Sequence, residues 1–159
     1  MKRSLMIIAF GYLILGFVAV GINVQAQGGL TARANQHPVN QSGVKGKILF
    51  TQTSAGLTVT GTSKGLAPTT AGRYISLVYD KGSNPGGPDV CEPTIPIDGM
   101  FVGIWISDAD GNGVLVQVAP PGEIAPLGSI DTISIRDTTI NDGFGPQAVV
   151  ACGQIAVNP

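Results

Sequence analysis

The feature that most limits the fold of this chain is a series of short segments in which apolar and polar residues alternate. Residues 57–62 show it clearly, because Leu57, Val59 and Gly61 would face one way and three threonines the other. Clusters of Gly, Pro, Asn and Asp separate the segments, and no segment has the period and end caps of an amphipathic helix. Such a chain buries its apolar residues by pairing strands into a sandwich or a barrel.

Seven segments are predicted to be β-strands; residues 44–52 alternate imperfectly, and residues 100–107 form the most apolar of them. They cover residues 44–52, 57–62, 73–79, 100–107, 114–118, 130–136 and 148–157. Their regular spacing and turn-rich connections predict an all-β Greek-key barrel or sandwich of about eight strands. The connection over residues 81–96 is long and rich in Gly and Pro, so we expect it to be either pinned or functional.

The first 26 residues have the layout of a secretory signal peptide. Lys2 and Arg3 precede an apolar run over residues 5–20, and small residues near Ala26 offer a cleavage site. The apolar run is long for a signal peptide, so an uncleaved membrane tether through residues 5–24 stays open. Both interpretations predict a secreted or extracytoplasmic protein, in a periplasm or on a cell surface.

Residues 27–42 are polar and have no period, which predicts a flexible tether that leads to one domain over residues 43–159. The only histidine, His37, lies in this segment and is expected to be solvated.

The charge of the chain argues against a nucleic-acid partner. Without Lys2 and Arg3, seven basic residues face ten acidic ones, and the basic residues form no cluster along the sequence. Proteins that bind nucleic acid or anionic lipid surfaces carry such clusters, so the sequence predicts neither partner.

The chain has two cysteines, Cys91 and Cys152, and in an exported protein these are most simply one disulfide. The chain-entropy model gives roughly 4 kcal/mol for closing a loop of about 60 residues. No second cysteine pair or nearby histidine would turn them into a metal site.

Two further patterns bear on chemistry. Residues 108–113 match the first half of an EF-hand loop, but Ala119 stands where the loop needs a bidentate glutamate. A hairpin turn is therefore predicted there, with weak cation binding as the alternative. Nucleophilic catalysis would lack a base, since the one histidine lies in the predicted tether, and no carboxylate pair suggests glycosidase chemistry.

Three stretches in order resemble the copper/zinc superoxide dismutase family, over residues 44–157. They are the first predicted hairpin with its Gly65-Leu66 turn, the DADGNGV hairpin over residues 108–114, and the terminal strand around Ala151-Cys152-Gly153. The resemblance implies a Greek-key barrel and a bond from Cys152 to a cysteine in the long connection, which would be Cys91.

The resemblance also implies where metal ligands should stand, and no histidine stands there. The positions of the family's His-x-His pair fall on Tyr74 and Ser76, and a later copper histidine falls on or near Arg136. The expected zinc ligands fall on Phe101 and Ile104. The position of the arginine that guides superoxide is Val149.

The sequence therefore predicts an exported superoxide dismutase-like domain that has lost its copper and zinc ligands. We expect no cofactor and a non-catalytic role in binding or structure. The alternative is a divergent extracytoplasmic dismutase in antioxidant defence that binds metal through other ligands, so enzymatic activity is left open.

On the family's geometry, five side chains would lie at the former metal site: Tyr74, Val78, Phe101 and Ile104, with Trp105 close by. One interpretation is that they fill and seal the old cleft, which we favour. The other is an exposed apolar patch that binds a partner protein or a small apolar ligand. A homodimer is left open as well.

Overall fold

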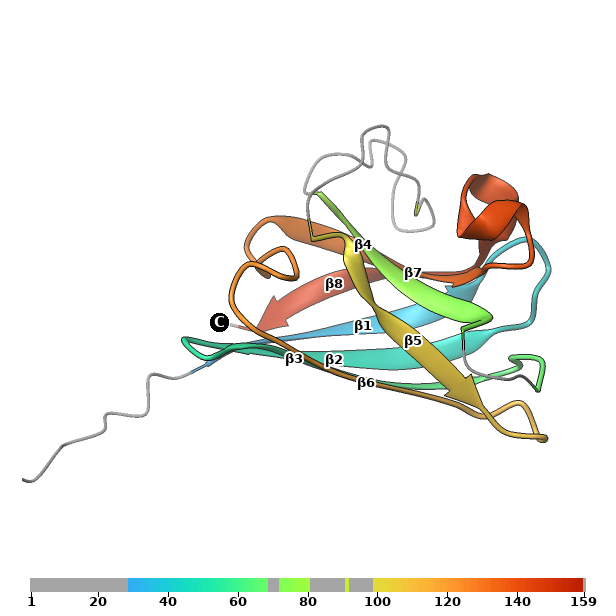
Figure 1. Cartoon of the computed structure of the whole chain (residues 1–159), viewed down its shortest axis with the longest axis horizontal. Coiled ribbons are helices and arrows are strands. Elements are labelled where there is room, and N and C mark those ends of the chain that lie inside the picture. The colour runs from blue at the N-terminus through green and yellow to red at the C-terminus, as the bar shows by residue number, and fades with distance from the viewer. Residues whose placement is uncertain (1–28, 69–71, 81–90, 92–98, 159) are drawn as a thin grey trace, which may run out of the picture.

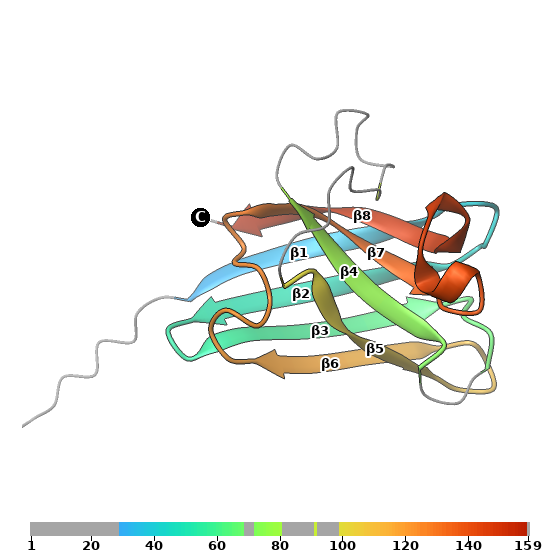
Figure 2. The ribbon, with the colours of Figure 1, turned by 45° about the horizontal axis from the view of Figure 1, so that its top comes forward.

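The computed structural model describes residues 29–68, 72–80, 91 and 99–158, and these form a closed barrel of eight antiparallel strands (Figure 1). The strand order around the barrel is β1-β2-β3-β6-β5-β4-β7-β8 (Figure 2). The strands are β1 (Leu30–Pro38), β2 (Lys45–Thr53), β3 (Gly56–Lys64), β4 (Tyr74–Asp80), β5 (Phe101–Ser107), β6 (Gly113–Ala119), β7 (Ile130–Asp137) and β8 (Val149–Asn158). Two short 3₁₀ turns, η1 (Asn141–Gly143) and η2 (Pro146–Ala148), lie in the β7–β8 connection. The prediction of an all-β barrel of about eight strands is confirmed.

All seven predicted strands are present, and their ends differ by no more than two residues from the predicted ones. The alternation in β3 is the one expected, since Leu57, Val59 and Gly61 are buried while the threonines between them are exposed. Residues 108–112 form the turn between β5 and β6, and Gly113 begins β6, so the hairpin turn predicted there is present.

The prediction of a flexible tether over residues 27–42 is wrong for residues 30–38, which form β1. This strand pairs with β2 on one side and β8 on the other, and so closes the barrel. Its inward residues are Ala32, Ala34 and Gln36, which give little hydrophobic signal. Alanine and glutamine are weak strand formers, so the pairing with two neighbours decides the conformation here.

The interior of the barrel is filled by aliphatic side chains and three aromatic ones, Phe50, Tyr74 and Trp105, of which Trp105 is the largest and is fully buried. Trp105 leans on β3 at Gly61, where a Cβ atom added to the glycine would lie 2.6 Å from the Cη2 atom of the indole. The glycine therefore makes room for the indole ring inside the barrel.

Cys91 and Cys152 form a disulfide with a Cα–Cα distance of 5.6 Å, as predicted. The disulfide ties the long β4–β5 connection to β8, outside the barrel interior. It packs in a second, smaller apolar cluster with Leu77, Tyr79 and Val149.

The predicted signal peptide (residues 1–26) and most of the long connection lie outside the described residues. Among the residues that are described, no helix is long and apolar enough to cross a membrane.

Candidate functional site

The structure does not bring the five predicted patch residues together. Tyr74, Val78 and Trp105 point into the barrel and belong to its core, whereas Phe101 and Ile104 lie outside it and are 48% and 45% exposed. The prediction that these five side chains form one surface patch is therefore wrong.

Polar atoms of two of the inward residues are satisfied inside the barrel. The indole Nε1 of Trp105 donates a hydrogen bond to Ser76 Oγ at 2.8 Å, and the Tyr74 hydroxyl accepts one from the Ala67 amide at 3.2 Å. Tyr74 and Ser76 thus have structural roles in the core.

The outward side of β4 carries Ile75, Leu77 and Tyr79. These side chains pack with the Cys91–Cys152 disulfide, Val149 and neighbouring apolar residues into the second cluster. This side of the barrel, rather than the positions of Tyr74 and Ser76, is the one on which Cys91 and the β7–β8 connection lie.

Arg136 on β7 is the centre of the polar contacts on this covered side, and it is 3% exposed. Its Nε donates to the Tyr79 hydroxyl at 2.8 Å and to Ser134 Oγ at 3.3 Å. The Tyr79 and Ser134 hydroxyl groups are themselves 2.6 Å apart, in hydrogen-bond contact.

The two terminal nitrogens of Arg136 bind the connections that cover it. One donates to the Gly143 carbonyl at 2.7 Å and the Gly145 carbonyl at 3.3 Å, and the other donates to the Cys91 carbonyl at 3.2 Å. The Cζ atom of Arg136 also lies 5.7 Å from the centroid of the Tyr79 ring. Among the described residues the partners of this guanidinium are all neutral, so its positive charge is held beneath the surface by oxygen dipoles and an aromatic ring.

The loop that Arg136 holds has an unusual backbone. Asn141, Asp142, Gly143 and Gly145 all have positive φ angles, between 48° and 85°. Left-handed backbone is unfavourable for residues other than glycine, so the hydrogen bonds from Arg136 offset a conformational cost.

A bidentate ion pair lies beside this network, between Arg73 and Asp137. The shortest distance, from Arg73 Nη2 to Asp137 Oδ2, is 2.8 Å. Burial raises the pKa of the Asp137 carboxyl, but hydrogen bonds from Arg73 and Thr139 and the charge of Arg73 outweigh it, so the pKa lies below its usual value. The hydrogen bond to Asp137 raises the pKa of Arg73 in turn.

In the β5–β6 turn, the carboxylate of Asp108 accepts hydrogen bonds from other residues of the same turn. Asp108 accepts hydrogen bonds from the backbone amides of Asp110 and Asn112 and from the Asn112 side chain, at 2.8–3.0 Å. The side-chain and backbone hydrogen bonds from Asn112 lower the pKa of Asp108. Carboxylate oxygens that already accept these hydrogen bonds are less available to coordinate a cation. A hairpin turn therefore accounts for the motif.

His37 is part of β1 and faces outward, in register with Cys152. No three His, Cys, Asp or Glu side chains gather as a metal site anywhere in the described ranges. Copper bound tightly by imidazoles needs several of them, and this chain has one.

Sequence reasoning missed the roles of Tyr79, Ser134 and the carbonyls of Gly143 and Gly145. An arginine inside an alternating apolar strand, as in residues 130–136, was the available signal. Among known proteins, no family model and no curated protein matches this chain.

Proposed function

We propose that this chain is an exported, superoxide dismutase-like barrel that has lost its copper and zinc ligands and acts as a non-catalytic binding or structural module. The observation that carries the proposal is Arg136, a buried permanent cation held by neutral oxygens on the covered side of the barrel. An arginine does not lose its proton in a protein, so it resists a metal cation at the same place.

The chain topology supports the relation to the family. Strands β4, β5 and β6 are consecutive neighbours, and β7 returns to lie beside β4. This order is that of a Greek key. The disulfide joins the long connection to the last strand, as the resemblance implies.

The chemistry of the covered side supports the loss of metals. The outward residues of β4 are Ile75, Leu77 and Tyr79, and none of these is a usual ligand of copper or zinc. Copper and zinc sites of the family's kind therefore do not fit the residues present, and we derive no redox step.

An experiment with metal tests the proposal. The purified protein is incubated with copper and zinc, desalted, and then examined for bound metal and for its effect on superoxide decay. We expect less than stoichiometric copper and no acceleration of superoxide decay. His37→Gln is the matched control, because it removes the one imidazole and shows whether any residual copper is a surface contact.

Stoichiometric copper together with dismutase activity would contradict the proposal and favour the divergent dismutase. Metal that binds without raising the melting temperature, and that disappears in His37→Gln, would leave the proposal intact.

A further inference from the structure

The side of the barrel away from Arg136 is an open sheet face, made by the outward residues of β1, β2, β3 and β6. We call it the cation–valine face. Its cations are Arg33, Lys45, Lys47 and Lys64, and its apolar residues are Leu49, Val114, Val116 and Val118.

The strand register sets the pattern of this face. Lys47 on β2 pairs with Thr62 on β3, which pairs with Val114 on β6. In the next row, Arg33 pairs with Leu49, and the row continues through Thr60 to Val116. Three of the four cations therefore lie on β1 and β2, β3 presents threonines with Lys64 at its end, and valines line β6.

The face has no acidic residue of its own, since none of these four strands contains Asp or Glu. The cluster is not a run of basic residues in the sequence, because Lys45 and Lys64 are 19 positions apart. The β2–β3 hairpin makes them direct cross-strand partners. Like charges directly opposite each other destabilise a sheet. Lys45 and Lys64 make no ion pair with any residue in the described ranges, so an external anion would relieve their repulsion.

The acidic residues nearest in sequence to this face, Asp108 and Asp110, do not neutralise it. They lie in the β5–β6 turn, where Asp108 is engaged by the amides of the turn itself. The lysines are therefore available to an anionic partner.

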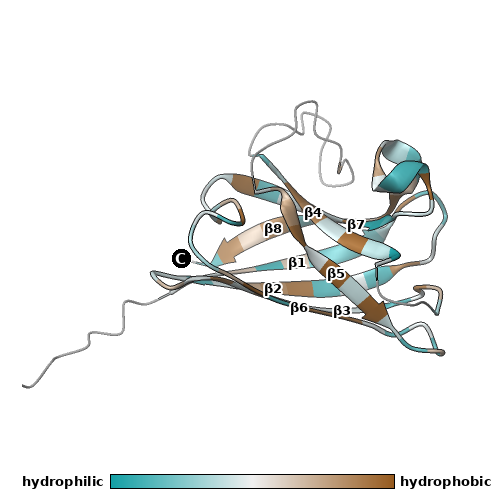
Figure 3. Ribbon diagram, in the orientation of Figure 1, coloured by the Kyte–Doolittle hydropathy of each residue, from teal (hydrophilic) through white to brown (hydrophobic). Residues whose placement is uncertain are grey.

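The valine half of the face is well exposed. Val114, Val116 and Val118 are 51%, 66% and 71% accessible, and Ile106 on the neighbouring β5 pairs with Val114 and is exposed too. Hydrophobic residues recur along β5 (Figure 3). A run of aliphatic residues beside lysines is a surface that could enter the boundary between lipid headgroups and acyl chains.

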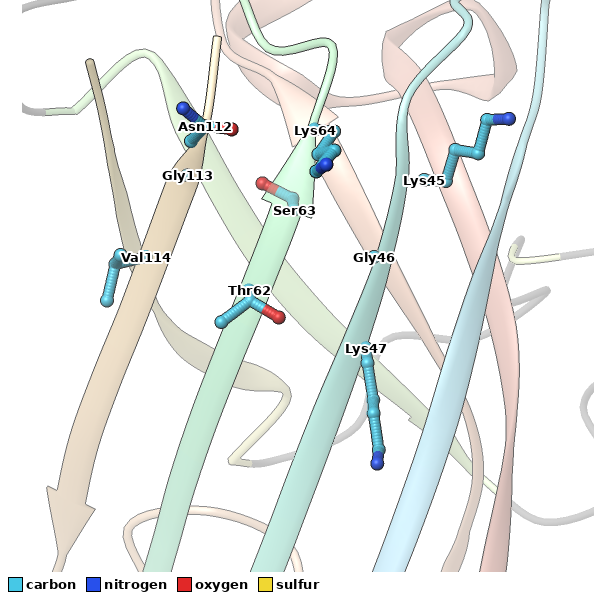
Figure 4. A pocket seen from close by; sticks show the side chains of 9 residues that line it. All are labelled: Lys45, Gly46, Lys47, Thr62, Ser63, Lys64, Asn112, Gly113 and Val114. Carbon is cyan, nitrogen blue, oxygen red and sulfur yellow. The ribbon is translucent and has the colours of Figure 1, made fainter. Parts of the chain in front are cut away.

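A shallow groove of about 490 Å³ lies where the two halves meet, between Lys45, Lys47, Lys64 and Val114 (Figure 4). The ammonium groups are at the ends of long apolar stems, so each lysine can place its charge at headgroup level while its stem covers apolar surface.

We propose that the cation–valine face docks on an anionic lipid bilayer. This inference rests on the proposed function, of which it names the partner. Lysines without ion pairs attract anions, and exposed valines are stabilised when they enter an apolar phase. A bilayer that contains anionic lipids provides both anionic headgroups and an apolar interior. A soluble polyanion would leave the valines in water, and a second copy of this chain would bring more lysines.

The N-terminal sequence provides a way to bring this face to a bilayer. The predicted membrane tether ends at residue 24 and β1 begins at Leu30, so the five residues between them could span about 17 Å at full extension. If the run is retained as an anchor, β1, which is one strand of the face, stays within reach of the membrane surface.

Vesicle flotation of the full-length protein tests the inference. Vesicles of phosphatidylcholine are compared with vesicles that also contain about 30 mol % phosphatidylglycerol, at low salt and at about 0.5 M salt. An apolar leader would insert into both kinds, so only the difference between them is scored. We expect tighter binding to the anionic vesicles, weakened by salt.

Two variants locate the binding surface. Lys45→Gln with Lys64→Gln should weaken binding to anionic vesicles roughly thirty-fold, since each lysine near an anionic surface is worth about 1 kcal/mol. The matched control is Asn141→Asp with Gln147→Glu, which changes the net charge by the same amount in the exposed β7–β8 connection and should bind as the unmodified protein does. Circular dichroism checks that each variant is folded.

The apolar half is tested by Val116→Thr with Val118→Thr, which keeps shape and strand propensity. We expect weaker vesicle binding and unchanged binding to inorganic polyphosphate.

Equal binding to both vesicle types, or equal loss in the control variant, would overturn the inference. So would a valine variant that binds vesicles normally, which would indicate a soluble polyanion, or a dimer that forms through the valines while vesicles are ignored. These results do not depend on dismutase activity, so the two proposals can fail separately.

Discussion

The side chain of Arg136 connects parts of the chain that are far apart in sequence by donating hydrogen bonds to neutral acceptors. Its guanidinium contacts β4 through Tyr79, the long connection through Cys91, and the β7–β8 connection through two glycine carbonyls. Removing it would leave the buried carbonyls of Gly143 and Cys91 without this donor, which costs more than the hydrogen bonds themselves contribute.

Arg136→Met is therefore expected to lower the free energy of unfolding by about 3 kcal/mol. Arg136→Lys keeps the charge but has fewer donors in a different geometry, and its stability should fall between that of Arg136→Met and that of the unmodified protein. Urea denaturation measures both variants. If Arg136→Met proves as stable as the unmodified protein, the network has no structural role of the kind we describe.

A second prediction at this scale concerns pH and Asp137. Its pKa in the folded protein lies below the value of about 3.9 expected when unfolded, so the unfolded chain binds the proton more readily. The ion pair then contributes stability above about pH 4, and this contribution is lost as the pH falls through the folded pKa.

Asp137→Asn should be less stable at neutral pH and should lose less stability between about pH 4 and more acidic values. Thermal unfolding across this range measures the slope. Asp142→Asn, an exposed carboxylate in η1, is the control and should keep the slope of the unmodified protein. An unchanged slope in Asp137→Asn would contradict the assignment.

At the scale of elements, the contact between β3 and β5 through Gly61 and Trp105 fixes the packing of the barrel interior. A Cβ atom at Gly61 would overlap the buried indole, which is also held by its hydrogen bond to Ser76. The ring has no free space to move into, because it is fully buried.

Gly61→Ala is expected to destabilise the barrel by about 1–3 kcal/mol, as overpacking does. Gly128→Ala is the matched control, since no heavy atom lies within 4 Å of its added Cβ, and it should change stability little. Urea denaturation with tryptophan fluorescence follows both stability and the indole environment. A neutral Gly61→Ala would show that the interior can relax around the ring.

At the scale of the whole molecule, the barrel has two unlike sides. One side is covered by connections, a disulfide and Arg136, whose hydrogen bonds are made within the protein. The other side is a bare sheet face with four cations and a row of valines. This division favours a protein whose covered side is structural and whose opposite side meets the partner.

The sequence alone determined the seven strands from residue 44 onward, the disulfide, and the lack of imidazoles for a metal site, because alternation, turn residues and composition are local or countable. It did not determine β1, whose alanines become strand residues only between two neighbours. The family resemblance grouped Tyr74 and Val78 with Phe101 at a former metal site, although the first two are core. Alternation alone could not correct this, because it separates two faces without saying which is inside. Only the tertiary structure placed Arg33 beside Leu49 of β2 and gathered three segments around Arg136, since both depend on contacts between distant residues.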